Sequence, residues 1–527
     1  MTALEKSIGH TCVSPIISVT ADDLAKKDVL VSVLSSDGKE IHVTTDVDQA
    51  MGFAIQHEHE IVFDEEKDRK LLRKIDMYLL PIMVLLYCFQ FMDKTSTSMA
   101  AIMGMREDLK MTGDKYSWVG SAFYLGYLAF EYPAVRILQR FPVAKTVASF
   151  IIIWGTILCL HAVPKYPGFL VLRTLLGMFE SAVTPAFVII TGQYYRKEET
   201  FVRTAIWFAS NGLGTIIGSG AIGYNLAVNA DSYSLEAWKL VFIITGVLTI
   251  ALGIIIMVHV PDDPTGAWWL NEEEKLRVIE RIRVNQQGFG NKHFKFYQFK
   301  EALTDIKTWL FFCFSLCQNI PNGGLTNFGT VLLSEDMGFT SEKALLMQMP
   351  GGAVEFVGCI ALALCSRWVK SRMFIAVFGT VVTLVACCML AFGKSVAVRY
   401  AGLTLEWFLP IGTICLLSNI SSNVAGHTKK TTVNAIFLIG YCVGNLIGPQ
   451  TFIATEAPSY RTAQICIVAF MAMSIVTLLA LWFCYWYENK KKDKYANLEE
   501  ARKLESLQNH EFADLTDKEN LLFRYEL

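Results

Sequence analysis

Apolar residues occur along this chain in twelve long runs, separated by short polar stretches. A helix needs about 20 mostly apolar residues to cross the hydrocarbon core of a bilayer, and every run reaches roughly that length. The pattern therefore predicts an all-α membrane protein with twelve spanning helices. These predicted spans are residues 75–95, 117–137, 146–164, 168–193, 203–228, 237–259, 308–333, 345–367, 373–393, 400–421, 431–455 and 462–486.

The polar stretches divide the chain into five parts. Residues 1–66 contain no apolar core and no signal-peptide pattern, so we predict a disordered cytoplasmic tail there. A first six-helix bundle is expected at 67–260, a cytoplasmic central loop at 261–306, and a second six-helix bundle at 307–487. Residues 488–527 are predicted to form a cytoplasmic C-terminal tail.

Lysine and arginine residues flank the predicted spans unevenly. Twelve spans place both termini on the same side of the membrane, and these basic residues are much more frequent on that side. Basic residues favour cytoplasmic loops, so both termini are expected in the cytoplasm. Lys429 and Lys430 begin span eleven on that side and are expected to anchor it at the membrane surface.

The composition excludes several classes of protein. The chain is 53% hydrophobic and 18% charged, which argues against disorder and against an ordinary soluble enzyme. Its 47 basic and 49 acidic residues leave a net charge of −2, so there is no electrostatic basis for nucleic-acid binding. No catalytic, zinc-ligand or nucleotide-binding motif is present, so we expect no enzyme activity, metal or cofactor. The glycine-rich run 212–223 in span five is expected to allow close helix packing.

Ionisable side chains inside the spans are the main functional candidates, because each costs about 2.5–3.5 kcal/mol on insertion scales. Arg173 and Glu180 in span four are seven residues apart, so they share a helix face about 10 Å apart. Arg173 could bind a substrate carboxylate, and Glu180 could couple transport to protons. The alternative for both is a structural ion pair with another helix.

Span one ends with Asp93 and Lys94. We predict that Lys94 binds the substrate and that Asp93 takes part in proton coupling. Alternatively, both side chains extend to the outer membrane surface. Glu355, near the middle of span eight, is a further candidate proton carrier, or else a buried hydrogen-bonded acid.

Helix-breaking and polar residues point to further substrate contacts. The segment NIPNGG at 319–324 in span seven is predicted to break the helix at mid-membrane, so that Asn319 and Asn322 can reach a substrate. A simple kink is the alternative. Asn445 in span eleven and Tyr124 in span two are weaker candidates for the same substrate site.

The sequence resembles the allantoate permease family, which is the anion:cation symporter branch of the major facilitator superfamily in fungi. The segments that carry the resemblance are FMDKTSTS, YSWVGSAFYLGYL, LRTLLGMFESAVTPAF, VPDDP, RIRVNQQGFGN, IPNGG, GNLIGPQTF and FADLTDKENLLFRYEL. The resemblance extends over nearly the whole chain from about residue 65. It implies a fold of two six-helix bundles and the proton-coupled uptake of a small organic anion at the plasma membrane.

The resemblance also implies roles for particular residues. Arg173 and Glu180 match a substrate-binding Arg and a proton-coupling Glu of the family, and Lys94 matches a basic residue that binds the anion. The implied substrates are allantoate, ureidosuccinate and short peptides. The expected partners are this anion, protons and the bilayer, with a monomeric protein. Uptake of another carboxylate or vitamin, such as nicotinate or pantothenate, and a non-transporting nutrient sensor remain alternatives.

Overall fold

The computed structural model describes residues 31–34, 40–43, 65–283, 295–365, 368–369, 371–495, 516–519 and 523–527. The chain divides into two units, Met1–Val62 and Phe63–Leu527. In the first unit, strands β1 (Val31–Leu34) and β2 (Glu40–Val43) pair antiparallel, with Val31 opposite Val43. The rest of the predicted N-terminal tail, up to residue 64, lies outside the described residues, so the prediction of disorder stays untested.

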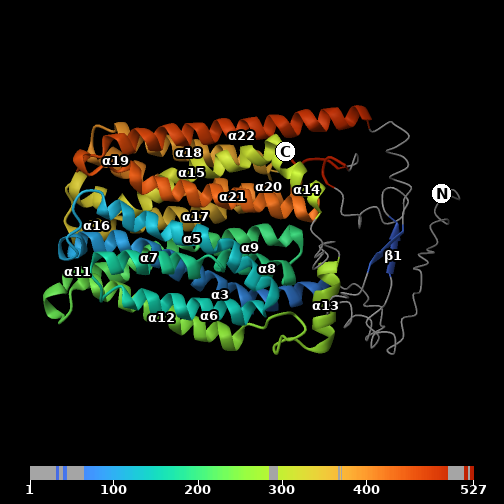
Figure 1. Ribbon diagram of the computed structural model, residues 1–527, viewed down its shortest axis with the longest axis horizontal. Helices are drawn as coiled ribbons and strands as arrows, with labels where there is room; N and C mark the ends of the chain where they lie inside the picture. Colours follow the sequence, from blue (N-terminus) through green and yellow to red (C-terminus); the bar gives the residue numbers. More distant parts are fainter. Residues whose placement is uncertain are drawn as a thin grey trace. The chain divides into compact units, whose positions relative to one another are not determined.

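The second unit is a set of long helices, and its N-terminal half provides the first six predicted spans (Figure 1). The structure divides spans four and five into shorter consecutive helices. The helices of this half are α3 (Glu65–Ala100), η1 (Ala101–Met105), α4 (Arg106–Asp108), α5 (Lys115–Arg140), α6 (Val143–Leu160), α7 (Tyr166–Glu180), α8 (Val183–Tyr194), α9 (Lys197–Ala209), α10 (Asn211–Thr215), η2 (Ile216–Gly223), α11 (Tyr224–Val228), η3 (Ala230–Ser232) and α12 (Ala237–His259).

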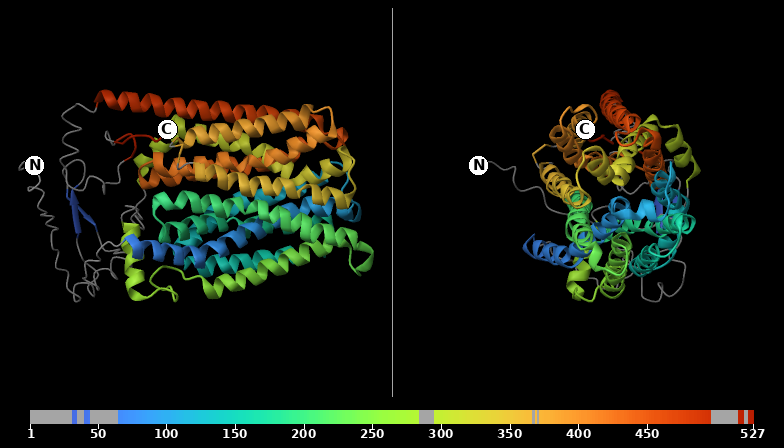
Figure 2. Two further views of the ribbon diagram at one scale, coloured as in Figure 1. Left: turned by 180° about the vertical axis from the view of Figure 1, so that it is seen from behind. Right: turned by 90° about the vertical axis from the view of Figure 1, so that its left-hand side faces the viewer.

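The C-terminal half repeats this arrangement after two short helices of the central loop, α13 (Glu272–Arg283) and α14 (Phe296–Thr304). The end-on view in Figure 2 shows the helices of the two halves as two groups. The remaining helices are α15 (Ile306–Val331), η4 (Leu332–Asp336), α16 (Ser341–Met347), α17 (Met349–Cys365), α18 (Arg372–Phe392), α19 (Val396–Leu405), η5 (Glu406–Phe408), α20 (Pro410–Asn423), α21 (His427–Ile447), η6 (Gly448–Thr451), η7 (Ala454–Glu456) and α22 (Arg461–Tyr495).

Each of the twelve predicted spans coincides with a helical segment of the structure. Within the described residues, ten segments are long and apolar enough to cross a membrane. The two remaining spans, α5 and α15, have 26 residues each, so they are long enough. Their polar and small side chains lower their apolar character instead, which is consistent with a position between other helices and away from lipid.

The structure corrects the prediction of a broken span seven. Helix α15 continues through Pro321 from Ile306 to Val331, although Pro321 donates no backbone hydrogen bond. The two following glycines serve close packing instead, because a Cβ on Gly323 would lie 2.6 Å from the Asn445 carbonyl oxygen of α21. Span ten is interrupted instead, as spans four and five are, because the 3-10 turn η5 separates α19 from α20 just before Pro410.

The glycine run of span five allows close approach between helices, as predicted. A Cβ on Gly214 would lie 2.3 Å from the Cys88 carbonyl oxygen of α3. A Cβ on Gly212 would lie 2.1 Å from the Gly352 carbonyl oxygen of α17. Gly212 therefore brings the N-terminal half and the C-terminal half into backbone contact.

Candidate functional site

A cavity lies between the two halves of the second unit. The space not filled by protein atoms is about 1040 Å³, including the part that is open to solvent. Helices α3, α5, α8, α9 and α10 line it from one half, and α15, α17, η5, α20 and α21 from the other. Among the predicted site residues, five line this cavity: Lys94, Tyr124, Asn319, Asn322 and Glu355.

Lys94 forms an ion pair with Glu180 at the wall of the cavity. The Lys94 Nζ atom lies 2.9 Å from Glu180 Oε1, and the Gln90 amide donates a second hydrogen bond of 2.9 Å to the same oxygen. The Glu180 side chain is fully buried, whereas 13% of the Lys94 side chain is exposed. Glu180 Oε2 is buried and has no hydrogen-bond partner within the described residues. A ligand in the cavity can therefore reach the cation but not the carboxylate.

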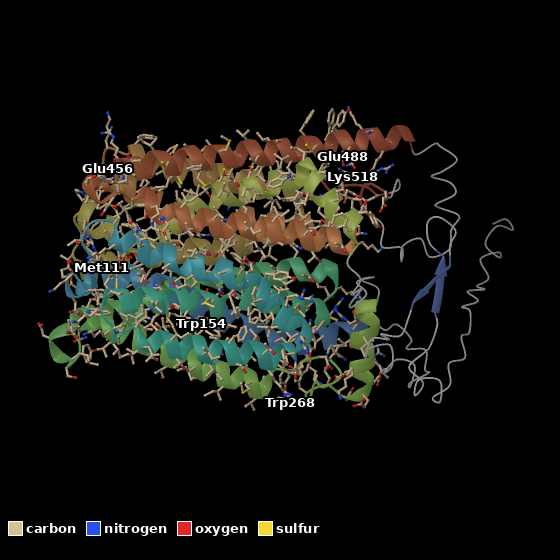
Figure 3. All side chains as sticks on the ribbon, viewed as in Figure 1. Met111, Trp154, Trp268, Glu456, Glu488 and Lys518 are labelled. Atoms are coloured by element: carbon tan, nitrogen blue, oxygen red, sulfur yellow. The ribbon has the colours of Figure 1, made fainter. Side chains whose placement is uncertain are left out.

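Asp93 and Arg173 lie in the interior of the N-terminal half and do not line the cavity. Trp154 of α6, labelled in Figure 3, donates its indole N–H to Asp93 Oδ2. Asp93 Oδ1 and Arg173 Nε are buried without a hydrogen-bond partner in the described part of the chain. Arg173 is near enough to Asp93 and Glu180 for electrostatic interaction, although no ion pair joins them among the described residues. Arg173, which is predicted to bind the substrate, therefore does not line the cavity in this conformation.

Three asparagines form a hydrogen-bonded chain between α15 and α21. The Asn322 amide donates to Asn445 Oδ1 over 2.8 Å, and the Asn445 amide donates to Asn319 Oδ1 over 3.1 Å. Asn319 and Asn322 line the cavity, whereas Asn445 is fully buried behind them. The predicted group is therefore assembled without a helix break, and Asn445 positions the two cavity asparagines.

Aromatic side chains form another part of the cavity wall. Tyr124 and Tyr127 of α5 face Tyr441 of α21, with ring centroids 6.1 and 6.3 Å from it. The Lys94 ammonium group lies 5.8 Å from the centroid of the Phe123 ring. Tyrosine rings give such a wall both apolar surface and hydroxyl groups for hydrogen bonding.

Glu355, the candidate proton carrier, lines the cavity, and Glu406 lines it beside Trp407. The sequence analysis missed Glu406, although it is an ionisable residue inside predicted span ten and carries the same signal as Glu355. Their side chains are 1% and 6% exposed, so both are largely shielded from solvent. Gln90, Asn211 and Tyr441 also line the cavity and were not predicted; only their polarity within apolar runs could have identified them.

One end of the helices, where α16 lies, is closed by contacts between the two halves. The Arg106 guanidinium is 2.5 Å from Glu335 Oε1. We call this end the α16 end, and the opposite end the α13 end (Figure 1). Further hydrogen bonds across it are Ser98 to Thr330 at 2.7 Å, Ser341 to the Ile102 carbonyl at 2.9 Å, Tyr116 to the Asn327 carbonyl at 2.6 Å, and Ser121 to the Leu446 carbonyl at 2.8 Å.

A cluster of buried charges lies at the α13 end of the C-terminal half. Lys307 and Lys429 begin α15 and α21, and Asp517 of the C-terminal tail lies 3.2 Å and 2.6 Å from their ammonium groups. The Tyr525 hydroxyl donates to Asp517 Oδ2 over 2.7 Å. Lys429 also pairs with Asp305 at 3.1 Å. Lys429 is therefore a buried ion-pair partner, which corrects the expectation that it anchors span eleven at the membrane surface.

The pKa of Asp517 reflects this cluster. Burial would raise the pKa of this carboxyl group, but the ammonium groups of Lys307 and Lys429 and the Tyr525 hydroxyl outweigh it and lower the pKa to about 2. The carboxylate is therefore charged at physiological pH. Residues 516–519 and 523–527 are attached to the helices by a charged, hydrogen-bonded contact.

Comparison with known proteins agrees with this geometry. Residues 83–449 match the model of the Major Facilitator Superfamily. The chain is 48% identical to the allantoate permease of Saccharomyces cerevisiae, over 96% of this chain and 95% of that protein. It is 49% identical to an uncharacterised transporter of Schizosaccharomyces pombe, over 91% and 94% of the two chains.

Solved structures show the same fold at low sequence identity. The crystal structure of the Escherichia coli fucose:proton symporter has a TM-score of 0.54 and 13% identity, over 77% of this chain and 99% of that one. An inward-facing bacterial homologue of the lysosomal transporter Spinster has a TM-score of 0.56 and 15% identity, over 77% and 96%. The chain belongs to the major facilitator superfamily and is a multi-pass membrane transporter, not an enzyme, related to the fungal allantoate permease.

Proposed function

We propose that this protein imports a small organic anion together with protons across the plasma membrane, with both termini in the cytoplasm. The proposed substrates are allantoate and ureidosuccinate. Identity of 48% to the allantoate permease over 96% of the chain supports this substrate class. The observation that carries the coupling mechanism is the ion pair between Lys94 and Glu180 at the wall of the cavity.

In this mechanism Glu180 takes up a proton, and the substrate anion then replaces Glu180 as the partner of Lys94. While Glu180 is ionised, it neutralises Lys94 and weakens the attraction for another anion. Protonation of Glu180 removes that competition and leaves a cation that a substrate carboxylate can bind. The bound anion then neutralises Lys94, which lowers the cost of enclosing the site away from water. A substrate that interacts differently with the two states shifts the equilibrium between them.

The contact between Arg106 and Glu335 acts in this proposal as the outer gate. It is closed here, so the cavity would exchange with the cytoplasm at the α13 end. Opening the α16 end exposes the cavity to the medium, where a lower pH favours protonated Glu180. Each charge moved across 100 mV is worth about 2.3 kcal/mol, so the membrane potential adds to the pH gradient in driving uptake if more protons than negative charges enter.

The test is uptake of radiolabelled allantoate in yeast that lacks its own allantoate transport. We expect faster uptake at external pH 5 than at pH 7.5, loss of accumulation with a protonophore, and competition by unlabelled ureidosuccinate. No uptake by protein that is present at the cell surface would contradict the substrate assignment. Competition by nicotinate or pantothenate instead would indicate a different carboxylate, and signalling without flux would indicate a sensor.

Variants separate binding from coupling. Glu180→Gln should keep exchange of labelled for unlabelled allantoate, because Lys94 remains available, but should lose uphill accumulation and its pH dependence. Lys94→Ala should lose both activities. Lys145→Ala is the matched control, because the Lys145 side chain is 69% exposed and distant in sequence from the cavity residues. Normal pH-dependent accumulation by Glu180→Gln would contradict the coupling mechanism.

A further inference from the structure

The C-terminal half contributes two carboxyl groups, Glu355 and Glu406, to the same cavity. Glu355 comes from α17 and Glu406 from the turn η5. Neither side chain forms an ion pair within the described part of the chain. Glu355 Oε2 is buried and finds no hydrogen-bond partner among those residues. The proposed exchange on Lys94 uses neither acid, so their role needs a separate explanation.

Close packing brings the two acids to one place in the wall. A Cβ on Gly351 would lie 2.4 Å from the Trp407 ring, so η5 lies directly on α17. Glu355 follows Gly351 by about one helical turn, and Glu406 precedes Trp407 in the chain. The two carboxyl groups are near enough to interact electrostatically, and the Asn211 side chain lies beside Glu355.

Two shielded carboxyl groups without a basic partner are an unusual feature in a cavity. Ionising both would be costly, because like charges repel each other strongly in a medium of low dielectric constant. Protons or N–H donors are needed to satisfy their oxygen atoms. Asn211 provides an amide for Glu355, and both acids line the cavity. A ligand with N–H groups would complete this part of the wall.

We propose that Glu355 and Glu406 form an acceptor subsite for the N–H groups of a ureido or amide moiety, while Lys94 binds the carboxylate of the same molecule. This inference rests on the proposed function and deepens it. The cavity then selects bifunctional substrates with a carboxylate at one end and N–H donors at the other. A plain carboxylate would leave the two acids with no donor from the ligand, and the Asn211 amide would serve Glu355 alone.

Aromatic side chains line the same cavity as Lys94 and the two acids. Phe91 of α3 contacts Trp407 in an edge-to-face arrangement, with ring centroids 5.7 Å apart. Phe91 precedes Lys94 by about one helical turn and Trp407 follows Glu406, so this ring contact joins the segment that carries the cation to the segment that carries an acid. A site with buried hydrogen-bonding groups strongly rejects analogues that lack the matching groups.

The test compares ureidosuccinate with succinate, which has the same two carboxylates but no ureido group. Purified full-length protein in detergent is heated with each compound, and the concentration that gives half of the maximal thermal stabilisation is measured. We expect wild-type protein to prefer ureidosuccinate by roughly tenfold or more. Succinate lacks the N–H groups that would donate hydrogen bonds to the two acids, and hydrogen bonds to charged groups are among the stronger ones. Glu355→Leu and Glu406→Leu should bring the two concentrations within about threefold of each other.

Controls keep the result interpretable. Glu107→Leu removes an exposed carboxylate from α4 and should leave the wild-type preference unchanged. If a leucine variant does not fold, Glu355→Gln and Glu406→Gln should still reduce the preference, because they remove the charge and keep the shape. An unchanged preference in folded variants of both acids would overturn the subsite. Loss of proton-driven uptake with the preference retained would contradict only the transport mechanism, because this assay measures binding.

Discussion

The Lys94 ammonium group is 2.9 Å from the Glu180 carboxylate, and this ion pair connects α3 with α7 at the edge of the cavity. The two members differ in access: the lysine side chain is 13% exposed and the glutamate is fully buried. A ligand must therefore meet the cation first. The carboxylate can respond to a ligand through its partners Lys94 and Gln90, or by taking up a proton.

The ion pair makes a prediction about stability as well as transport. Lys94→Ala leaves a buried carboxylate without its cation, which typically costs about 3–5 kcal/mol. We expect a clear fall in the melting temperature together with loss of uptake. Lys94→Ala combined with Glu180→Gln should recover most of the thermal stability but none of the uptake, because the neutral amide needs no cation. Thermal unfolding in detergent and uptake by the same variants test this, and uptake by Lys94→Ala would contradict it.

The ion pair between Arg106 and Glu335 predicts how readily the α16 end opens. Both side chains are partly exposed, at 26% and 35%, so the pair is worth only about 0.2–1 kcal/mol. Glu335→Gln should increase the population of the open state by no more than about fivefold. A cysteine introduced at Thr326, which lines the cavity, should then react faster with an impermeant thiol reagent added outside. The exchanged pair Arg106→Glu with Glu335→Arg should return the rate towards wild type.

The sequence predicted the helices and part of the site for clear physical reasons. Apolar runs of membrane length can satisfy their backbone hydrogen bonds only as helices, and all twelve coincide with helical segments. Lys94 and Glu355 were identified because an ionisable group in lipid is costly, and both line the cavity. Glu406 carries the same signal in span ten, so its omission was an error of interpretation and not a limit of the sequence.

Other features depend on contacts between distant segments, which a single sequence does not contain. Lys94 and Glu180 are on different helices, α3 and α7, and the distance between them depends on how the helices of the whole bundle are arranged. Arg173 shares a helix with Glu180, yet it lies among buried groups outside the cavity, because Glu180 lies nearer the cavity along that helix. The partners of Lys429 include Asp517, which is far away in the sequence. Most of α21, all of α22 and part of the C-terminal tail separate the two residues.

The charge cluster at the α13 end predicts that the C-terminal tail is held by Asp517. Lys429 is 1% exposed and contacts the Asp517 and Asp305 carboxylates, so Lys429→Met would remove one of the ammonium groups that neutralise these buried acids and leave Lys307 as their remaining buried cation. Asp517→Asn should weaken the attachment of the tail more than Asp493→Asn does. The Asp493 side chain is 65% exposed and contacts Arg524. Limited proteolysis should release the tail faster from Asp517→Asn than from Asp493→Asn. Equal release rates would contradict a role for Asp517 in holding the tail.

The same contact has a defined pH dependence. The pKa of Asp517 falls from an ordinary value of 3.8 to about 2, because Lys307 and Lys429 outweigh the effect of burial. A lowered pKa stabilises the attached state above pH 3.8, and this contribution is lost as the pH falls from 3.8 to about 2. The full contribution is about 2 kcal/mol, at 1.36 kcal/mol per pKa unit. Release of the tail should accelerate in this acid range for wild-type protein, and Asp517→Asn should remove that component of the acid response.

The contact between Gly212 and Gly352 predicts a conformational defect from a single methyl group. A Cβ on Gly212 would lie 2.1 Å from the Gly352 carbonyl oxygen, which is too close, so Gly212→Ala must separate α10 from α17. This contact joins the two halves in the closed state. Destabilising that state by about 1.4 kcal/mol is enough for a tenfold effect, so we expect uptake to fall at least tenfold. Gly192→Ala in α8 is the matched control, because no atom lies within 4 Å of its added Cβ. Uptake is measured at equal surface levels of both variants. Wild-type rates for Gly212→Ala would mean that the backbone contact is not needed in the transport cycle.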